Sequence, residues 1–317
     1  MFEAVEVLAL GADDATQRRL VAALELPAVD YSSLRNLLRQ VNDRYGSGAA
    51  IANVLYTRDV ARLTPTDRER LEDDLHCEVS SAADAREVVT QALKRVGLSG
   101  DAGRSIFAPS SSFGVVNVLH VSSTWQSAFD PRATTMLPFR TLHGPVRVPY
   151  LRREGTYATL RTRAATTVVL PFADGSRVVV YVPGEVGALP GGWEAETMRA
   201  VADRSLTDEH VLLSIPKFHV ESTVSFGAAL QATAKLTTAD RVYGWPARTL
   251  DAAHLARVTI DEHGASISAA TVITRSKRKS NPAVLAVDRP FGFMVLDASS
   301  TVVLVKGSIF DPVRGAA

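Results

Sequence analysis

The 317-residue sequence predicts an α+β fold built as a single domain over residues 1–317. Helical spacing of apolar residues dominates up to Gly97, whereas the alternating pattern of strands dominates from Gly114 onward. This segregation of helices from strands is typical of α+β proteins. No internal repeat, low-complexity stretch or linker divides the chain, and a hydrophobic content of 46% allows a large core.

Helices account for most of the N-terminal part. Phe2 to Leu10 and Asp14 to Leu24 have helical spacing and are separated by Gly11, and Asp13 or Asp14 can cap the second helix. Thr64 to Leu75 begins Thr-Pro-Thr-Asp-Arg-Glu, as a helix N-terminus should. The other predicted helices are Tyr31 to Tyr45 and Ser80 to Val96.

Strands dominate the remainder of the chain. Asp174-Gly175 predicts a hairpin turn, and Pro216 predicts an edge position or a bend within residues 211–222. The predicted strands are Ala49 to Tyr56, Gly114 to Val121, Met136 to Leu151, Ala158 to Phe172, Ser176 to Val182, residues 211–222 and Leu255 to Glu262.

Composition excludes several classes of protein. A formal net charge of +1 argues against a nucleic-acid-binding or membrane protein. No apolar run approaches the roughly 18 residues of a membrane span. The one cysteine, Cys77, rules out an internal disulfide or a zinc cluster and is expected to be a buried thiol. We therefore expect a monomer that uses no metal or cofactor.

Enzyme motifs are absent from the sequence. It contains no G-x-S-x-G, H-E-x-x-H, G-x-x-x-x-G-K-[ST] or G-x-G-x-x-G pattern, and its seven histidines lie at unrelated spacings. The sequence therefore predicts a protein that is not an enzyme.

The segment from His254 to Pro290 has the most unusual pattern. The strand Leu255 to Glu262 ends near Gly264, and a two-residue period of small, uncharged residues then continues over residues 265–274. Four cations follow within five positions, Arg275-Ser276-Lys277-Arg278-Lys279. A strand-like segment that ends in a protease-attractive basic cluster suggests a loop able to become a strand once it is cut.

Several motifs in this order resemble the serpin family of serine protease inhibitors. VTIDEHGASISAATVIT (258–274) resembles the serpin hinge, and VDRPFGFMVLDASSTVVLVKGSIFDP (287–312) resembles the C-terminal signature with its buried hairpin. VNVLHVSSTWQSAFDP (116–131) is similar to the central strand and the tryptophan after it. LALGADDAT (8–16) resembles a motif at the end of the family's second helix.

The resemblance implies a serpin fold: a large mixed central sheet, two smaller sheets, surrounding helices and an exposed reactive-centre loop at about 264–286. It implies that Ala49 to Tyr56 is an edge strand of the large sheet. The family's first helix has no counterpart, so we expect an N-terminally shortened, prokaryotic member. The start of the chain shows no signal peptide, so residence is cytoplasmic by default, or extracellular if a targeting segment precedes Met1.

The resemblance also assigns site residues. Trp125 marks the breach, the top of the sheet where the loop first inserts, and Lys217 pairs there with the hinge glutamate, Glu262. Asn117 and His254 form the shutter beneath the centre of the sheet, whose serine-bearing partner segment has no counterpart here. The hinge comprises Glu262, Gly264, Ala265, Ser266, Ile267, Ser268, Ala269 and Ala270.

The implied activity is suicide inhibition of a serine protease. Arg278 is the fourteenth residue after Gly264, which by the resemblance favours Arg278-Lys279 as the reactive bond, with Lys277-Arg278 or Lys279-Ser280 as one-residue alternatives. A basic residue before the cut selects trypsin-like proteases, and Arg275-Ser276-Lys277-Arg278 also fits furin-, kexin- or subtilisin-like enzymes. A non-inhibitory binder, carrier or protease substrate is the alternative, because Ile267 is bulky for an inserting hinge.

Overall fold

The fold was analysed in a computed structural model of the chain. The structure describes residues 2–24, 31–33, 35–36, 49–81, 84–98, 111–121, 123–187, 189–203, 205–264, 282–299 and 303–313. It contains two compact units: unit 1 comprises Met1–Arg44, Ala50–His120 and Ser222–Ala256, and unit 2 comprises Tyr45–Ala49, Val121–Glu221 and Arg257–Ala317. The single domain expected over residues 1–317 stays a prediction.

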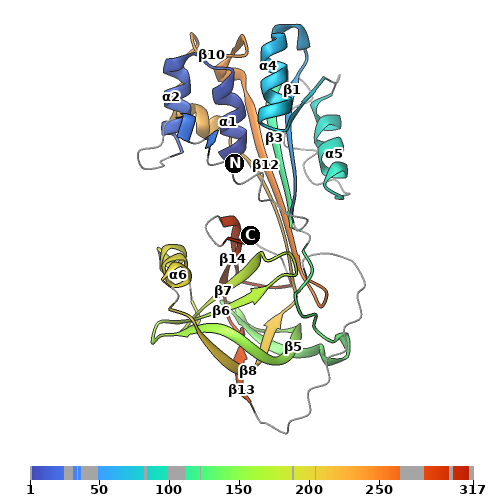
Figure 1. The fold of residues 1–317 in the computed structure, drawn as a ribbon, viewed down its shortest axis with the longest axis vertical. Helices are drawn as coiled ribbons and strands as arrows, with labels where there is room; N and C mark the ends of the chain where they lie inside the picture. Colours follow the sequence, from blue (N-terminus) through green and yellow to red (C-terminus); the bar gives the residue numbers. More distant parts are fainter. Residues whose placement is uncertain are drawn as a thin grey trace. The chain divides into compact units, whose positions relative to one another are not determined.

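Unit 1 contains the N-terminal helices (Figure 1). Asp13 caps α2 by accepting from the amides of Ala15 and Thr16, as expected. Thr64 forms a capping box at α4, which continues as a π-helical segment to Asp74. The helices are α1 (Phe2–Leu10), α2 (Asp14–Ala22), α4 (Pro65–Glu69), α5 (Ala85–Arg95) and α7 (Gly227–Thr233).

One predicted helix begins later than expected. Cys77–Ser80 is a strand, β2, and α5 begins only at Ala85, because Asp84 accepts from the amide of Arg86 and so caps the helix there. The predicted helix Tyr31 to Tyr45 lies largely outside the described residues.

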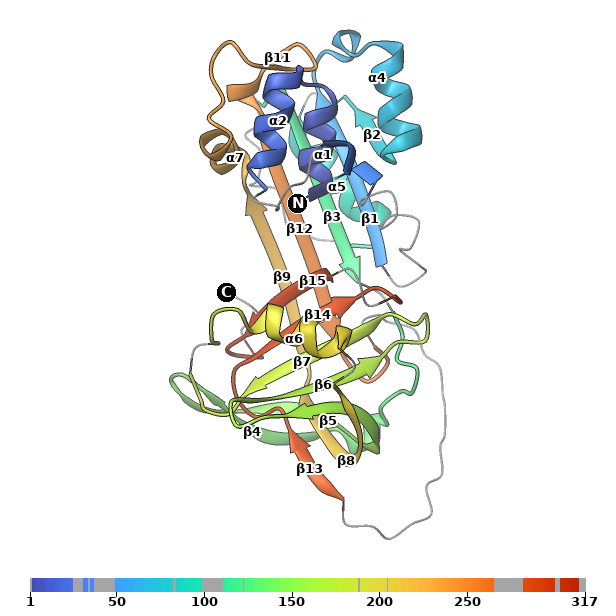
Figure 2. The ribbon, with the colours of Figure 1, turned by 60° about the vertical axis from the view of Figure 1, so that its left-hand side comes forward.

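A five-stranded sheet has the order β2-β1-β3-β12-β9 (Figure 2). Because β2 pairs in parallel with β1, β1 is second from the edge, and the expectation of an edge strand at Ala49 to Tyr56 was wrong. The four other strands are β1 (Ala49–Thr57), β3 (Phe113–Val121), β9 (Phe218–Ser225) and β12 (Asp251–Ile260).

Strands β3 and β12 are neighbours in this sheet and run in the same direction. Both begin in unit 1 and end in unit 2, whereas β9 runs from unit 2 into unit 1. The sheet is therefore mixed. Among the described residues, no strand lies between β3 and β12.

Unit 2 contains an eight-stranded sheet of order β13-β8-β5-β6-β7-β14-β15, with β4 also pairing with β5. The predicted strand Met136 to Leu151 is in fact a hairpin, because Thr141 closes a turn by donating to the carbonyl of Gly144. The strands are β4 (Thr135–Thr141), β5 (Gly144–Arg161), β6 (Ala165–Pro171), β7 (Arg177–Pro183), β8 (Thr207–Pro216), β13 (Ala283–Ala286), β14 (Phe291–Leu296) and β15 (Val303–Ile309).

The long strand β5 joins two groups of strands, one beside β8 and one beside β6. Its residues Tyr150–Thr159 pair with β8, and Thr159–Arg161 pair with β6. One strand of 18 residues therefore joins both groups into one eight-stranded sheet, and the predicted α+β fold of sheets and helices is confirmed. The predicted Asp174-Gly175 turn and the C-terminal hairpin of β14 and β15 are both present, but only β14 is buried along its length, and β15 is half-buried or exposed up to Ile309.

Each unit has its own core. In unit 1, α1 and α2 pack with Phe113 and Tyr243, and α5 packs on β1 and β3. In unit 2, Phe139, Phe218 and Phe291 lie in the main cluster, and helix α6 (Trp193–Ala202) contributes Trp193 to a second one. Cys77 is fully buried, as expected, and burial raises the pKa of its thiol well above the ordinary value.

Candidate functional site

Two polar clusters lie at the strands β3 and β12, one in each unit. The Trp125 cluster, in unit 2, comprises Trp125, Thr134, Lys217, Asp261 and Glu262. The Asn117 cluster, in unit 1, comprises Glu3, Asn53, Asn117 and His254. These clusters contain all five of the described residues predicted for the breach and the shutter: Trp125, Lys217, Glu262, Asn117 and His254.

In the Trp125 cluster, Trp125 links the segment that follows β3 to the segment that follows β12 by hydrogen bonds. Its backbone amide donates to the carbonyl of His263 at 2.9 Å, and its indole Nε1 donates to the carbonyl of Asp261 at 2.8 Å. The ring stacks on Phe172 with centroids 4.7 Å apart and meets Phe129 edge-on. The tryptophan is thus held by both its polar edge and its faces.

Glu262 is the charged centre of the same cluster. Its Oε2 accepts from Lys217 Nζ at 2.7 Å and its Oε1 accepts from Thr134 Oγ1 at 2.7 Å. The residue is 8% exposed. Burial alone would raise the pKa of the Glu262 carboxyl, but the bonds from Lys217 and Thr134 outweigh it, so the pKa is lowered. The carboxylate therefore stays ionised at neutral pH and holds Lys217 in place.

A tight turn after β12 ends at Gly264. The carboxylate of Asp261 accepts from the amides of His263 and Gly264, and the amide of Asp261 donates to the carbonyl of Gly264. Gly264 has φ +138° and pairs with Thr124. A Cβ there would lie 2.7 Å from Thr124 Cα and 2.9 Å from Trp125 N, so no larger residue fits.

Lys217 owes its position to the break in the predicted strand over residues 211–222. Pro216 ends β8 in the eight-stranded sheet, and the chain enters the five-stranded sheet as β9 at Phe218. Lys217 lies between the two strands, where its amide donates to the carbonyl of Pro149. The bend predicted from Pro216 is therefore present.

The Asn117 cluster links three strands and a helix. Asn117 Nδ2 donates to Asn53 Oδ1 and to Glu3 Oε2, both at 2.6 Å. The side-chain oxygen of Asn117 contacts His254 Nδ1, so the hydrogen is on that nitrogen when the ring is neutral. One amide thus connects β3 to β1, β12 and α1.

Burial controls both titratable groups of the Asn117 cluster. It raises the pKa of Glu3 above its ordinary value, because it disfavours the carboxylate. It lowers the pKa of His254 to about 3, because it disfavours the imidazolium. His254 is therefore neutral at physiological pH.

Sequence patterns did not predict Glu3, Asn53, Thr134 or the turn role of Asp261. One signal for Glu3 was available: an acidic residue in the otherwise apolar first turn of FEAVEVLAL. Thr134 and Asn53 had no such signal, because their partners lie 128 and 64 positions away in the chain.

The remaining predicted site residues lie outside the described residues. They are the hinge residues Ala265, Ser266, Ile267, Ser268, Ala269 and Ala270, the basic residues Arg275 and Lys277, and the reactive pair Arg278 and Lys279. The predicted roles of the breach, shutter, hinge and reactive bond therefore stay predictions. Among the described residues, no group of His, Cys, Asp and Glu could hold a metal ion, and no helix has the length and apolar character needed to cross a membrane.

Comparison with known proteins identifies the fold. The family model described as "Serpin (serine protease inhibitor)" matches residues 1–312. Serine protease inhibitor 42Dd of Drosophila melanogaster is 24% identical over 96% of this chain and 87% of its own. The structure of native protease nexin-1 with heparin superposes with a TM-score of 0.78 at 18% identity, covering 98% and 90% of the two chains. The structure of human thyroxine-binding globulin complexed with thyroxine superposes with a TM-score of 0.76 at 20% identity, covering 98% of this chain and 90% of its own.

Proposed function

The chain belongs to the serpin family, and from that premise we propose that it inhibits a serine protease by suicide cleavage of the segment between Gly264 and β13. The proposed targets are trypsin-like or furin-, kexin- or subtilisin-like enzymes that cut after a basic residue. The observation that supports this most is the direct adjacency of β3 and β12, with no strand between them among the described residues.

This adjacency leaves a place for an inserting strand. A segment that turns back after Gly264 would run antiparallel to β12, and also to β3, because those two strands are parallel to each other. Insertion would replace one parallel pairing with two antiparallel ones, which are somewhat more stable per residue. About a dozen new ladder hydrogen bonds at roughly 0.5–1.5 kcal/mol each would stabilise the inserted state by on the order of 10 kcal/mol.

Two sets of contacts would have to break before the strands separate. One is the set around Trp125, in which the amides of Trp125 and Phe129 donate to the carbonyls of His263 and Glu262. The other is the contact between Asn117 and His254. These contacts would hold the sheet closed while the loop is intact, and they can re-form with new partners at small net cost.

The proposed chemistry begins at Arg278. The serine hydroxyl of the protease attacks the carbonyl carbon of Arg278, the bond to Lys279 breaks, and the Lys279 amine leaves with a proton. Arg278 then remains esterified to the protease. Rapid insertion of residues 265–278 would carry the protease along and distort it before water hydrolyses the ester.

A non-inhibitory function is the alternative, and Ile267 is the observation in its favour. A β-branched residue early in the hinge would slow insertion, so that the ester hydrolyses first and the protein is consumed as a substrate. The structure of human thyroxine-binding globulin with bound thyroxine, which has the same fold, supports a small-molecule carrier as one form of this alternative.

The test is incubation of the purified protein with trypsin and, separately, with a kexin-type subtilase. Inhibition predicts a covalent complex that survives boiling in detergent and contains the first 278 residues joined to the protease. An Arg278→Ala variant is the matched control and should form far less complex with trypsin. Cleavage at Arg278 with full protease activity remaining would reject inhibition and favour the non-inhibitory alternative.

A further inference from the structure

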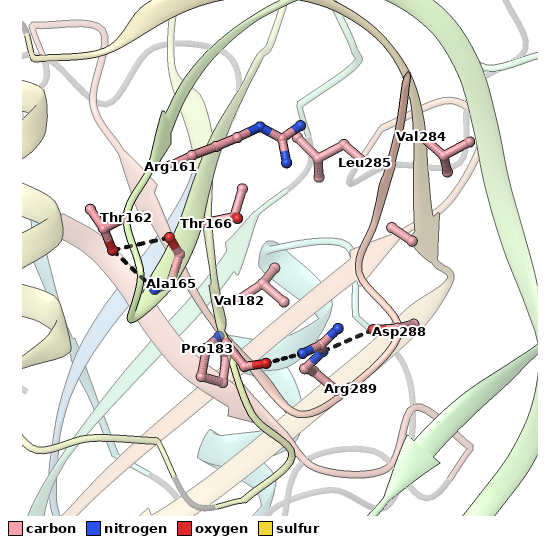
Figure 3. Close-up of a pocket in the computed structure, with 12 residues that line it drawn as sticks. Arg161, Thr162, Ala165, Thr166, Val182, Pro183, Val284, Leu285, Asp288 and Arg289 are labelled. Carbon is pink, nitrogen blue, oxygen red and sulfur yellow. Dashed lines mark hydrogen bonds and ion pairs between the residues drawn. The ribbon is translucent and has the colours of Figure 1, made fainter. Parts of the chain in front are cut away.

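A pocket of about 270 Å³ lies in unit 2, beside the strand that follows the predicted loop. It is bounded by the end of β5 at Arg161, by Thr166 on β6, by Val284 and Leu285 on β13, and by Arg289 (Figure 3). The two arginines lie on opposite sides of the space, and neither belongs to the Trp125 or the Asn117 cluster.

Both arginines keep donors available on the pocket side. Arg161 uses only Nε, which donates to the carboxylate oxygens of Glu209 at 2.9 and 3.2 Å. Arg289 uses Nε toward Asp288 and Nη1 toward the carbonyl of Gly184. Within the described part of the chain, the Nη atoms of Arg161, Nη2 of Arg289 and Oγ1 of Thr166 make no hydrogen bond.

The carboxylates nearby do not compete for these donors. Asp288 also accepts from Arg140 at 2.9 and 3.0 Å. Burial would raise the pKa of the Asp288 carboxyl, but the bonds from Arg140 and Arg289 outweigh it and the pKa is lowered. The three arginines Arg140, Arg161 and Arg289 thus face two carboxylates, Asp288 and Glu209. The local balance is one positive charge in excess, and free guanidinium donors match carboxylate and phosphate oxygens in geometry.

The pocket also contacts a weakly anchored strand. β13 has four residues and pairs with β8 alone among the described strands. It inserts Leu285 into the core, whereas Val284 is 56% exposed. An edge strand of this length has few ladder bonds to hold it. A ligand touching β13 on one side and Arg161 and Thr166 on the other would tie the strand to the sheet.

We propose that this pocket binds a small organic anion carrying at least two phosphate or carboxylate groups, held between Arg161 and Arg289, and that its binding stabilises β13 on β8. The proposal goes beyond protease inhibition and does not rest on it. Because the anion binds the folded protein, it raises the unfolding free energy by RT ln(1 + [L]/Kd), a gain that keeps growing with the logarithm of anion concentration.

Binding is measured by calorimetry with pyrophosphate, citrate and inorganic phosphate in 150 mM salt. We expect pyrophosphate or citrate to bind at least tenfold more tightly than inorganic phosphate, because two anionic groups can reach both arginines. Arg161→Met should weaken that binding at least tenfold. Arg257→Met is the matched control: it removes another arginine–glutamate pair of unit 2, with Glu221, away from the pocket, and should change affinity less than twofold.

Hydrogen exchange locates the effect and separates it from general anion binding. With saturating anion, the amides of Ala283–Ala286 should exchange at least tenfold more slowly in the wild-type protein and at an unchanged rate in Arg161→Met. The proposal is overturned if none of the anions binds, if Arg161→Met and Arg257→Met lose affinity equally, or if binding leaves exchange in β13 unchanged.

Discussion

The ion pair between Lys217 and Glu262 joins residues 45 positions apart in the chain. The side chain of Glu262 is 10% exposed and that of Lys217 is 34% exposed. The pair is therefore partly screened by solvent, and its contribution lies between that of a surface pair and that of a fully buried one. The larger cost comes from leaving one partner alone, because Glu262 would then be a buried carboxylate that keeps the Thr134 hydroxyl as a donor but has lost its cation.

We therefore predict that Lys217→Met lowers the unfolding free energy by about 1–2 kcal/mol at pH 7. The pKa of Glu262 is lowered in the folded state, so the stability that its ionised form contributes is present above an unfolded value near 4.5 and is lost as pH falls through the folded pKa. Urea denaturation should show the loss at pH 7 and a smaller one near pH 3. Lys217→Met/Glu262→Gln should recover part of the stability. An equal loss at both pH values would mean that the pair is not responsible.

Glu3 is predicted to have the opposite pH dependence. Its folded pKa is raised by burial, so its contribution to stability is fully present below about 4.5 and is lost as pH rises through the folded pKa. Each unit by which the folded and unfolded pKa values differ corresponds to about 1.4 kcal/mol of unfolding free energy. Glu3→Gln keeps an oxygen that can accept from Asn117 but removes the buried charge. We expect this variant to be more stable than wild type at pH 8 and equally stable near pH 4.

The measurement is urea denaturation of both proteins between pH 4 and pH 8. Both proteins contain His254, whose folded pKa is about 3. The stability that neutral His254 contributes is lost as pH falls from 6.5 toward about 3 in both proteins, so it cancels in the comparison. Glu87→Gln on the exposed face of α5 is the control and should track wild type. A Glu3→Gln variant that is less stable at pH 8 would show that the carboxylate is a net stabiliser.

At the scale of elements, sequence patterns located most helices and strands but not all of their boundaries. Met136 to Leu151 was predicted as one strand because the reversal at Leu142 and His143 lacks an Asn-Gly or Asp-Gly signal. The turn instead depends on the Thr141 hydroxyl, which accepts from the amide of His143, and on Gly144 at φ +116°. Similarly, the helix predicted from Ser80 begins only at Ala85, because Asp84 caps it there. The break between β8 and β9 at Pro216 could be predicted, because proline has no amide hydrogen to donate to a neighbouring strand.

The candidate site was predictable to a similar extent. Trp125 and Glu262 could be located from motifs near the strand ends, and so could Asn117 and His254. Their partners Thr134, Asn53 and Glu3 could not, because which side chains meet depends on how distant elements pack. Gly264 lies between these cases: a glycine after a strand suggests a turn, but the close approach of Thr124 that makes it irreplaceable follows only from the fold.

The hinge segment carries a prediction about rate. If inhibition depends on insertion of residues 265–278, replacing Ile267 with alanine should speed the first stage, because a smaller side chain has less to fit beneath the sheet. The fraction of trypsin trapped per molecule of Ile267→Ala cleaved should rise at least severalfold over wild type. It is measured as the stoichiometry of inhibition at fixed protease. Val284→Ala, outside the hinge, should match wild type, and an unchanged stoichiometry in Ile267→Ala would remove the hinge as the limiting feature.

For the whole molecule, inhibition by insertion requires that the intact chain stores free energy that cutting releases. β3 and β12 are parallel neighbours when the loop is intact. A cut loop can pair with both strands, and about a dozen new inter-strand hydrogen bonds would stabilise the cut protein by on the order of 10 kcal/mol. At about 2.1 cal/mol/K of unfolding entropy per residue, a gain of 1 kcal/mol raises the melting temperature of a 317-residue chain by about 1.5 °C, so a rise of roughly 15 °C is expected here.

The prediction is that cleavage near Arg278 raises the melting temperature by this amount without any partner present. Calorimetry compares intact protein with protein nicked by trypsin and then freed of it, and protein exposed to inactivated trypsin is the control. Placing arginine or aspartate at Ala269 should abolish the rise, since a charge at an inserting position cannot be buried without a partner. If the nicked protein melts where the intact one does, the sheet does not accept the loop, and the chain is a serpin-fold protein that works without insertion.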